Sequence, residues 1–473
     1  MNTTKVSDNV NVVTNEESKL KFGEKVAATI NGATGSFHTQ MISMFLLFFY
    51  TDMMKIDPAY VAVLFLVTRI AAAIISPVFG LVVDKISTPW GKYKPWYILI
   101  GVLTGVTGWL TFTVFDFSTT GKLVYVTVTY VLYTLIKAMA YGPGSAIGPT
   151  MTKRLDDRMS INQISYFLMI ITIMFVQIGI QPLYKKIGGG DGTKGFSIIM
   201  GALAIISILI GIYQSFAIKE RYIVQKNKEK KKVSIKEMIA LVFTNKTAVI
   251  SFMYTLGINL STSIKTGVTM YYFKYYFENE GLVALTGAVT ILPTLIGVAL
   301  SPKITKRIGV KRNMFIGSLI AVITMAGVIA VPPTQVGVVM YVILLVIGAL
   351  FTGFSTPVQG TLMPAAMDYT EWKTGKNVNA FMGSFSGFLQ TVANAISGSV
   401  VAGSLAFIGY VGGAAEQSSG TILGLKVLMS IAPAIAMALT LIIVKFDLTE
   451  EKQAQISKDL TERRKKAEAE AEN

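Results

Sequence analysis

The chain has 473 residues, of which 52% are hydrophobic and only 15% are charged, and its formal net charge is +16 at pH 7. A soluble domain carries roughly 25% charged residues, so this composition predicts an integral membrane protein and excludes a soluble globular one. The absence of cysteine and the presence of a single histidine exclude disulfides and zinc sites built from these residues. We predict no metal ion, no cofactor and no enzymatic activity.

Apolar runs of about 20 residues recur along nearly the whole chain, and each is long enough to cross a hydrocarbon core as a helix. They predict an all-α membrane protein with twelve transmembrane helices, at residues 27–52, 58–84, 95–117, 122–149, 160–184, 194–218, 247–276, 281–302, 312–332, 336–364, 379–410 and 421–446. Lys and Arg gather in alternate loops, so we expect a multi-pass protein of the cell membrane with both termini in the cytoplasm. This topology signal accounts for the positive charge without a nucleic-acid partner.

A basic segment between the sixth and seventh spans divides the chain into two sets of six helices. The first residues contain no apolar core, so we expect no cleavable signal peptide. The last residues alternate Glu with Lys, which predicts a solvated helix or a disordered extension. A monomer in the lipid bilayer is the expected state. We predict, in chain order, a cytoplasmic tail at 1–26, an N-terminal six-helix bundle at 27–218, a cytoplasmic linker at 219–246, a C-terminal six-helix bundle at 247–446 and a cytoplasmic tail at 447–473.

The loop after the second span has the composition of a hinge between rocking helices. It combines glycines that allow close helix approach, an acid at a helix end and a cationic cluster expected to face the negative cytoplasmic leaflet. Its residues are Gly80, Asp84, Lys85, Gly91 and Lys92. A matching basic loop, Ser301–Arg312, follows the eighth span, and the fourth and tenth spans both end in Gly/Pro-rich stretches, at 141–145 and 353–360. Interrupted helices at matching places in two halves point to a binding site near the membrane midplane.

Five stretches carry a resemblance to a known family. They are Phe49–Asp52, Leu64–Ile70, Trp90–Trp96, Tyr271–Phe273 and Asp368–Gly375. Together they resemble the glycoside-pentoside-hexuronide cation symporters of the major facilitator superfamily, over almost the whole chain. The resemblance implies two pseudo-symmetric six-helix bundles around a central cavity, alternating access, and uptake of a sugar driven by sodium, lithium or protons.

The chain departs from the resembled family where that family binds its cation. The family carries two acids on the second span, and this chain has Ala72 and Ser76 in their place. The family's acids on the fourth and first spans fall on Tyr141 and Ser36, and its lysine on the eleventh falls on Ala395. A desolvated sodium ion needs several oxygen ligands and usually a negative charge. We therefore predict that the usual cation site is lost, and whether a proton or another cation couples transport stays open.

Few titratable groups remain in the spans to couple transport to a proton. A lone histidine in a helix interface is commonly a hydrogen-bonded structural group, so His38 is either a proton carrier or a packing residue. Besides the hinge-loop residues, the candidate coupling and gating residues are His38, Asp52, Asp368 and Glu371.

Three cations lie inside predicted spans, namely Lys137, Lys265 and Arg69. A cation at the membrane centre is expensive unless it faces water, a counter-ion or a ligand. If both lysines face a cavity with few carboxylates, they favour an acidic ligand such as a uronide or a sulfonated sugar. Two alternatives stay open. The lysines snorkel or form structural pairs, or one of them occupies the place of the lost cation, which would make the protein a uniporter or exchanger of neutral sugars.

Neutral polar residues complete the predicted substrate site because their amides and hydroxyls can hydrogen-bond sugar hydroxyls. Tyr141 lies one turn after Lys137 on the same helical face and can stack on a sugar ring. By the resemblance, Gln390 and Thr391 align with sugar-side positions of the family. The candidate substrate-binding residues are Lys137, Tyr141, Lys265, Asn259, Gln359, Gln390, Thr391, Asn394, Ser36 and Arg69.

These features predict a secondary transporter, or permease, that moves a small-molecule substrate, a sugar or glycoside, by alternating access, and they favour an acidic one such as a hexuronide. A uniporter or exchanger of neutral oligosaccharides, and a transporter of a non-sugar organic acid or a lipid-like solute, stay open as alternatives. A non-transporting receptor or scaffold would need neither hinge loop.

Overall fold

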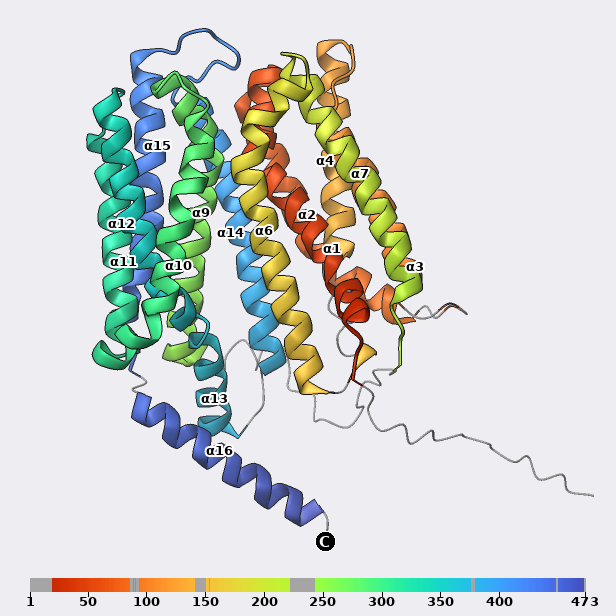
Figure 1. The fold of residues 1–473 in the computed structure, drawn as a ribbon, viewed down its shortest axis with the longest axis vertical. Helices are drawn as coiled ribbons and strands as arrows, with labels where there is room; N and C mark the ends of the chain where they lie inside the picture. Colours follow the sequence, from red (N-terminus) through yellow and green to blue (C-terminus); the bar gives the residue numbers. More distant parts are fainter. Residues whose placement is uncertain are drawn as a thin grey trace, which may run out of the picture.

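Long helices that run side by side along one direction build the molecule (Figure 1). The computed structural model describes residues 19–85, 88, 90, 93–140, 150–152, 154–221, 243–375, 379–447 and 450–471. The helices confirm the predicted all-α architecture with twelve spans. Eight helices in this described part are long and apolar enough, by length and composition alone, to cross a membrane.

Six of the twelve spans come from the first half of the chain. They are α1 (Phe22–Met41), which continues through the π-helical turns η1 (Ile42–Leu46) and η2 (Phe49–Met53), then α2 (Pro58–Lys85), α3 (Lys94–Leu110), α4 (Thr119–Met139), α6 (Leu155–Ile187) and α7 (Gly192–Ala217). The fourth span was expected to run to residue 149, but α4 ends at Met139, and residues 141–149 lie outside the described part. Most of the predicted linker, residues 222–242, also lies outside it.

The second half supplies the other six spans and two further helices. The spans are α9 (Lys246–Tyr271) with its π-helical turn η3 (Tyr272–Tyr276), α10 (Leu282–Ile308), α11 (Val310–Gly327) with the short η4 (Val328–Ala330), α12 (Gln335–Gln359), α14 (Asn379–Phe407), and α15 (Ser419–Ala438) with η5 (Leu439–Lys445). Helix α13 (Leu362–Thr374) follows α12, and α16 (Glu450–Ala471) ends the chain.

Polar caps set where five of the spans begin. A side-chain oxygen just before a helix accepts a hydrogen bond from a backbone N–H that the first turn leaves unpaired. The capping residues of α4, α7, α9, α12 and α15 are Ser118, Asp191, Asn245, Thr334 and Ser418. The boundaries of these helices therefore follow from residues that are visible in the sequence.

Helices within each half pack closely, and further helix contacts join the halves. In the first half α3 packs against α7, and in the second α10 packs against α12. A Cβ atom at Gly105 of α3 would lie 2.9 Å from the carbonyl oxygen of Ala204 in α7, so the small residue permits this approach. Between the halves, α2 contacts α14, α6 contacts α10, and the π-helical turn η1 contacts α9.

The tail helix α16 is docked through one of its faces. Ile456 and Leu460 are buried in an apolar cluster with Leu362 of α13. The Trp372 indole N–H donates to Asp459 over 2.8 Å, and Arg463 donates to the Trp372 carbonyl over 3.0 Å. Of the two alternatives expected for this tail, residues 450–471 form the helix. It packs through one face because it carries two apolar residues one turn apart.

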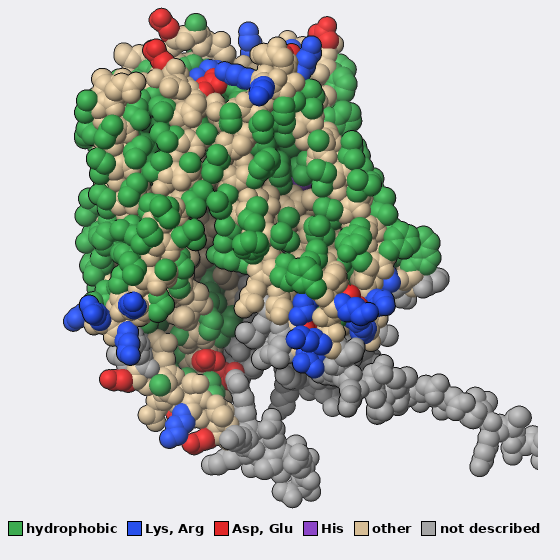
Figure 2. Space-filling view, viewed as in Figure 1, with side chains coloured by type: hydrophobic (Ala, Val, Ile, Leu, Met, Phe, Trp, Pro, Cys, Tyr) green, Lys and Arg blue, Asp and Glu red, His purple; other side chains and the backbone are tan. Residues whose placement is uncertain are grey.

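The two ends of the molecule differ. The first turn of α1 and helices α13 and α16 lie at one end, named the terminal end (Figure 1). Figure 2 shows a broad apolar band around the middle of the molecule, with Lys and Arg side chains at both ends of it and more of them toward the terminal end. It also shows a hollow between the two halves that opens toward the terminal end. At the opposite end the halves are in contact.

Candidate functional site

A buried carboxylate ties the two halves together at the end opposite α16. Asp52, in η2 of the first half, accepts hydrogen bonds from Lys274, Tyr275 and Tyr410 of the second half. The Asp52 side chain is 1% exposed and that of Lys274 is 27% exposed. The three donors satisfy a charge that would be costly to bury alone. We name these four residues the clasp.

A second ion pair joins the halves at the same end. The ammonium of Lys185 lies 2.7 Å from a carboxylate oxygen of Glu280, and the Tyr184 hydroxyl donates to the same oxygen over 2.8 Å. Burial raises the pKa of Glu280, but the hydrogen bonds from Lys185 and Tyr184 outweigh it and hold that pKa below its usual value. The Lys185 side chain is 56% exposed, so this pair contributes less to the closure than the clasp does.

The two charged clasp residues stand in matching backbone features of the two halves. Asp52 belongs to the π-helical turn at the end of the first span, and Lys274 to the one at the end of the seventh. A residue in the left-handed region follows each turn, Lys55 with φ 58° and Glu278 with φ 53°. π-Helical turns are rare and are frequent at functional sites. The same local feature thus brings opposite charges from the two halves to one place.

Backbone and aromatic contacts complete the closure around the clasp. The hydroxyls of Thr51 and Tyr271 are 2.8 Å apart, and the rings of Phe48 and Tyr271 meet edge to face at 5.8 Å. The loop after α14 crosses directly over the first span, because a Cβ atom at Gly412 would lie 2.0 Å from the carbonyl oxygen of Thr51. This end of the molecule is therefore sealed by apolar packing as well as by charge.

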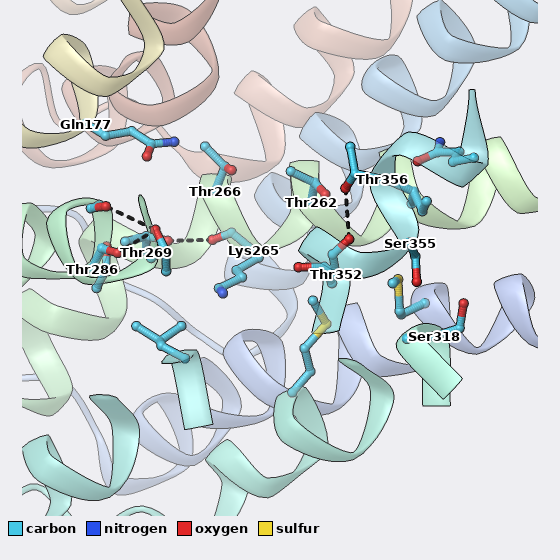
Figure 3. Close-up of a pocket in the computed structure, with 18 of the residues that line it drawn as sticks. Gln177, Thr262, Lys265, Thr266, Thr269, Thr286, Ser318, Thr352, Ser355 and Thr356 are labelled. Carbon is cyan, nitrogen blue, oxygen red and sulfur yellow. Dashed lines mark hydrogen bonds between the residues drawn. The ribbon is translucent and has the colours of Figure 1, made fainter. Parts of the chain in front are cut away.

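A cavity of about 360 Å³ is lined mainly by helices of the second half (Figure 3). Lys265 of α9 stands in its wall with Thr262, Thr266 and Thr269, which share one helical face because they follow the spacing i, i+3, i+4, i+7. The lining residues in the described part of the chain include no Asp or Glu. Lys265 therefore shares the described wall of the cavity with hydroxyl groups and with no carboxylate.

The remaining polar wall comes from neighbouring helices. Its hydroxyl and amide residues are Thr286 and Thr290 of α10, Ser318 of α11, and Tyr341, Thr352, Ser355, Thr356 and Gln359 of α12. The lining residues that come from the first half are Met44 and Gln177. A Cβ atom at Gly287 of α10 would lie 3.1 Å from the Gln177 side chain, so α6 and α10 touch beside the cavity.

Two of the predicted substrate-binding residues, Lys265 and Gln359, line this cavity. Asn259 is not among its lining residues, and its amide donates to the Thr255 carbonyl over 2.8 Å. Ser36 is also outside the lining, and its hydroxyl donates to the Gly32 carbonyl over 2.7 Å.

The other two predicted cations lie outside the cavity lining. The Lys137 ammonium donates to the carbonyl of Gly35 over 3.0 Å and so links α4 to α1 inside the first half. The Arg69 guanidinium contacts the Tyr130 hydroxyl at 3.4 Å and lies 5.6 Å from the centre of the Phe65 ring. Lys137 is thus held within the first half, whereas the Arg69 guanidinium also lies beside α14 of the second half, since a Cβ atom at Gly398 would be 3.2 Å from it.

His38 lies in a tightly packed site within α1. Its residue is 1% exposed, and its Nδ1 lies 3.0 Å from the Thr34 carbonyl oxygen. The ring stacks on Tyr133 at 6.1 Å, while Nε2 is buried without a hydrogen-bond partner among the described residues. A Cβ atom at Gly108 would lie 2.7 Å from the ring. The packing role expected for this histidine has direct contacts, and its proton role stays a prediction.

The other candidate residues lie on α13, α2 and α14 or outside the described part of the chain. Asp368 and Glu371 lie on α13 at the terminal end. Only the backbone is described for Gly80, Asp84 and Lys85 on α2 and for Gln390, Thr391 and Asn394 on α14. Tyr141, Gly91 and Lys92 lie outside the described residues.

Sequence reasoning missed the partners of Asp52 and most of the cavity wall. Lys274 lies 222 residues from Asp52, so no local pattern joins them. Lys185 could have been singled out from the sequence, because it is a basic residue in a loop where few basic residues were expected. The threonines around Lys265 had one too, since their spacing marks one helical face.

Comparison with known proteins places this geometry among transporters. The family model described as "MFS/sugar transport protein" matches residues 31–450. The isoprimeverose transporter of Lactiplantibacillus pentosus is 28% identical over 414 residues, which cover 85% of this chain and 84% of that protein. A proposed sulfoquinovose importer of Salmonella typhimurium is 25% identical over 456 residues and 94% of each chain.

A solved structure supports the fold. A bacterial homologue of the human lysosomal transporter Spinster, in an inward-facing and unoccupied conformation, superposes with a TM-score of 0.65 and 12% identity, over 90% of this chain and 98% of that one. At this identity the likeness concerns the arrangement of the helices alone.

Proposed function

Because the chain belongs to the MFS/sugar transport protein family, as its resemblance to the glycoside-pentoside-hexuronide symporters predicted, we propose that it carries an acidic sugar or glycoside, such as a hexuronide, across the cell membrane by alternating access. The observation that carries the proposal is a cavity whose wall presents a lysine and many hydroxyl groups but no described carboxylate, beneath a closed end. An acidic sugar would supply the missing negative charge.

The terminal end faces the cytoplasm in this proposal. In the described part of the chain Lys and Arg are more numerous at that end than at the other, as they are on the cytoplasmic side of membrane proteins (Figure 2). The clasp then closes the extracellular end, and the hollow between the halves opens inward. Transport requires the opposite form, in which the clasp separates and the halves meet at the terminal end.

One relative is named for a negatively charged substrate, which would complement the positive charge of Lys265 in the cavity. The proposed sulfoquinovose importer is named for a sulfonated sugar, whereas the isoprimeverose transporter is named for a neutral one. The family thus includes proteins named for both kinds of substrate, and Lys265 in the cavity is what favours an acidic one here.

Loss of the usual cation site is part of the same proposal. Ala72 is buried on α2 where the resembled family carries an acid, and a methyl group offers sodium neither an oxygen ligand nor a charge. Proton coupling or exchange of one solute for another then replaces sodium as the driving reaction.

Uptake is expected to be insensitive to sodium and lithium. In proteoliposomes that contain the full chain, the initial rate of methyl glucuronide uptake should be the same with an inward sodium gradient, an inward lithium gradient or choline in their place. Accumulation that depends on a sodium gradient would contradict the loss of the site. Uptake of neutral oligosaccharides only, or of hydrophobic acids only, would favour the corresponding alternative substrate class.

A further inference from the structure

The wall groups that donate hydrogen bonds and those that accept them indicate which chemical groups the ligand carries, beyond what the charge of the wall indicates. We infer that the cavity is a subsite for a ligand with one anionic group and several hydroxyl donors, and that Lys265 takes the anion while threonines of α9, α10 and α12 take the hydroxyls. The inference rests on the proposed function and assigns substrate recognition chiefly to the second half of the chain.

Five threonines of the cavity wall donate the hydrogen bond of their hydroxyl group to the protein itself. Their hydroxyls each donate to a carbonyl of their own helix, over 2.7 to 3.1 Å. These residues are Thr269, Thr286, Thr290, Thr352 and Thr356. A hydroxyl that donates in this way presents its lone pairs to the cavity, so it accepts hydrogen bonds from a ligand. A polyhydroxylated ring provides such donors, and an aliphatic chain does not.

Lys265, unlike these threonines, offers the ligand only hydrogen-bond donors. An ammonium group offers three donors and no acceptor, so it needs an acceptor, and a charged one binds best. The described lining contains no carboxylate, and an ammonium in a membrane interior is costly when unpaired. A carboxylate or sulfonate on the ligand satisfies both needs at once. An anion at Lys265 and hydroxyls at the threonines together describe a sugar acid.

The first half contributes to the cavity through Gln177, while its own lysine is occupied elsewhere. Gln177 reaches the lining from α6, so a bound ligand contacts both halves (Figure 3). Lys137 bonds to the Gly35 carbonyl and is not part of the lining. It is therefore a matched control, because it is also a lysine inside a span but has a partner within the protein.

Binding to the purified full-length protein, measured by calorimetry, tests this assignment with three probes that share a six-membered ring. Methyl β-D-glucuronide has the anion and hydroxyls, methyl β-D-glucoside lacks the anion, and cyclohexanecarboxylate lacks the hydroxyls. The glucuronide should bind at least about tenfold more tightly than either of the others, the effect of one charged hydrogen-bonded pair. Lys265→Met should abolish its preference over the glucoside, and Lys137→Met should keep it.

Each alternative outcome has a definite meaning. A preference that survives in Lys265→Met or disappears in Lys137→Met overturns the assignment, as does equal binding of cyclohexanecarboxylate and the glucuronide, or binding of none of the probes. Lys265→Arg should retain the preference, which separates loss of charge from loss of fold. The proposed function fails by a different result, namely that proteoliposomes with the unsubstituted protein take up no sugar, acidic or neutral.

Discussion

Asp52→Ala is expected to shift the protein toward a form that is open at the clasp end. The substitution removes the shared acceptor of Lys274, Tyr275 and Tyr410, and it leaves the ammonium unpaired in a largely buried place. Removing one partner of a buried ion pair costs about 3–5 kcal/mol. About 3 kcal/mol corresponds to roughly a hundredfold change in the equilibrium between closed and open forms.

The native chain offers a clean way to measure this shift because it has no cysteine. Thr262→Cys places a single thiol in the cavity wall. We expect a membrane-impermeant maleimide, added on the clasp side of proteoliposomes, to label this thiol slowly in the parent protein. With Asp52→Ala, labelling should be roughly a hundredfold faster, as the estimated energy implies.

Lys185→Met is the matched control for the clasp variant. It breaks the other ion pair between the halves, but its side chain is 56% exposed, and exposed pairs contribute only about 0–1 kcal/mol. Labelling should therefore rise by less than about fivefold. If Asp52→Ala is labelled no faster than Lys185→Met, the clasp does not hold the closed form.

Gly412→Ala should hinder the same closure without removing any charge. The added Cβ would lie 2.0 Å from the Thr51 carbonyl oxygen and 2.8 Å from its carbonyl carbon. Both are backbone atoms, so no change of rotamer relieves the contact, and the loop must move away from the first span. Overpacking of this kind costs about 1–3 kcal/mol. The thiol at position 262 should then be labelled about 5- to 100-fold faster from the clasp side.

Gly420→Ala controls for the loss of a glycine near the same loop. A Cβ atom there would meet only the Ser418 hydroxyl, at 3.8 Å, which is an ordinary contact. Its labelling rate should match that of the parent. A Gly412→Ala protein that melts at a lower temperature but labels like the parent would show that the glycine serves folding and not closure.

The fold was predictable from the sequence because the bilayer fixes the length of each span. Apolar runs are local features, and they located all twelve helices. Caps such as Ser118 and Asn245 are local too, and they set where some of these helices begin. The end of α4 and the tail were harder. The length of an apolar run does not mark where a helix stops, and the packing of Ile456 depends on where α13 lies.

The candidate site was predictable only at residues that are unusual by themselves, namely charged side chains inside membrane spans. Lys265 and Asp52 stood out because charges in spans are costly. Their surroundings did not, because the partners come from distant segments and from the backbone. Lys137 is the clearest case, since its partner is the carbonyl of Gly35, a group that every residue carries. A sequence shows that a charge needs a partner but does not show which one it has.

Counterflow of radiolabelled methyl glucuronide would show whether the protein carries an acidic sugar through Lys265. Proteoliposomes that contain the full chain are loaded with unlabelled methyl glucuronide and diluted into a trace of the labelled compound, without sodium, lithium or a pH gradient. We expect a transient accumulation of label that Lys265→Met abolishes and Lys137→Met preserves. Transient accumulation with methyl glucoside but none with the glucuronide would contradict the proposed transport of an acidic sugar.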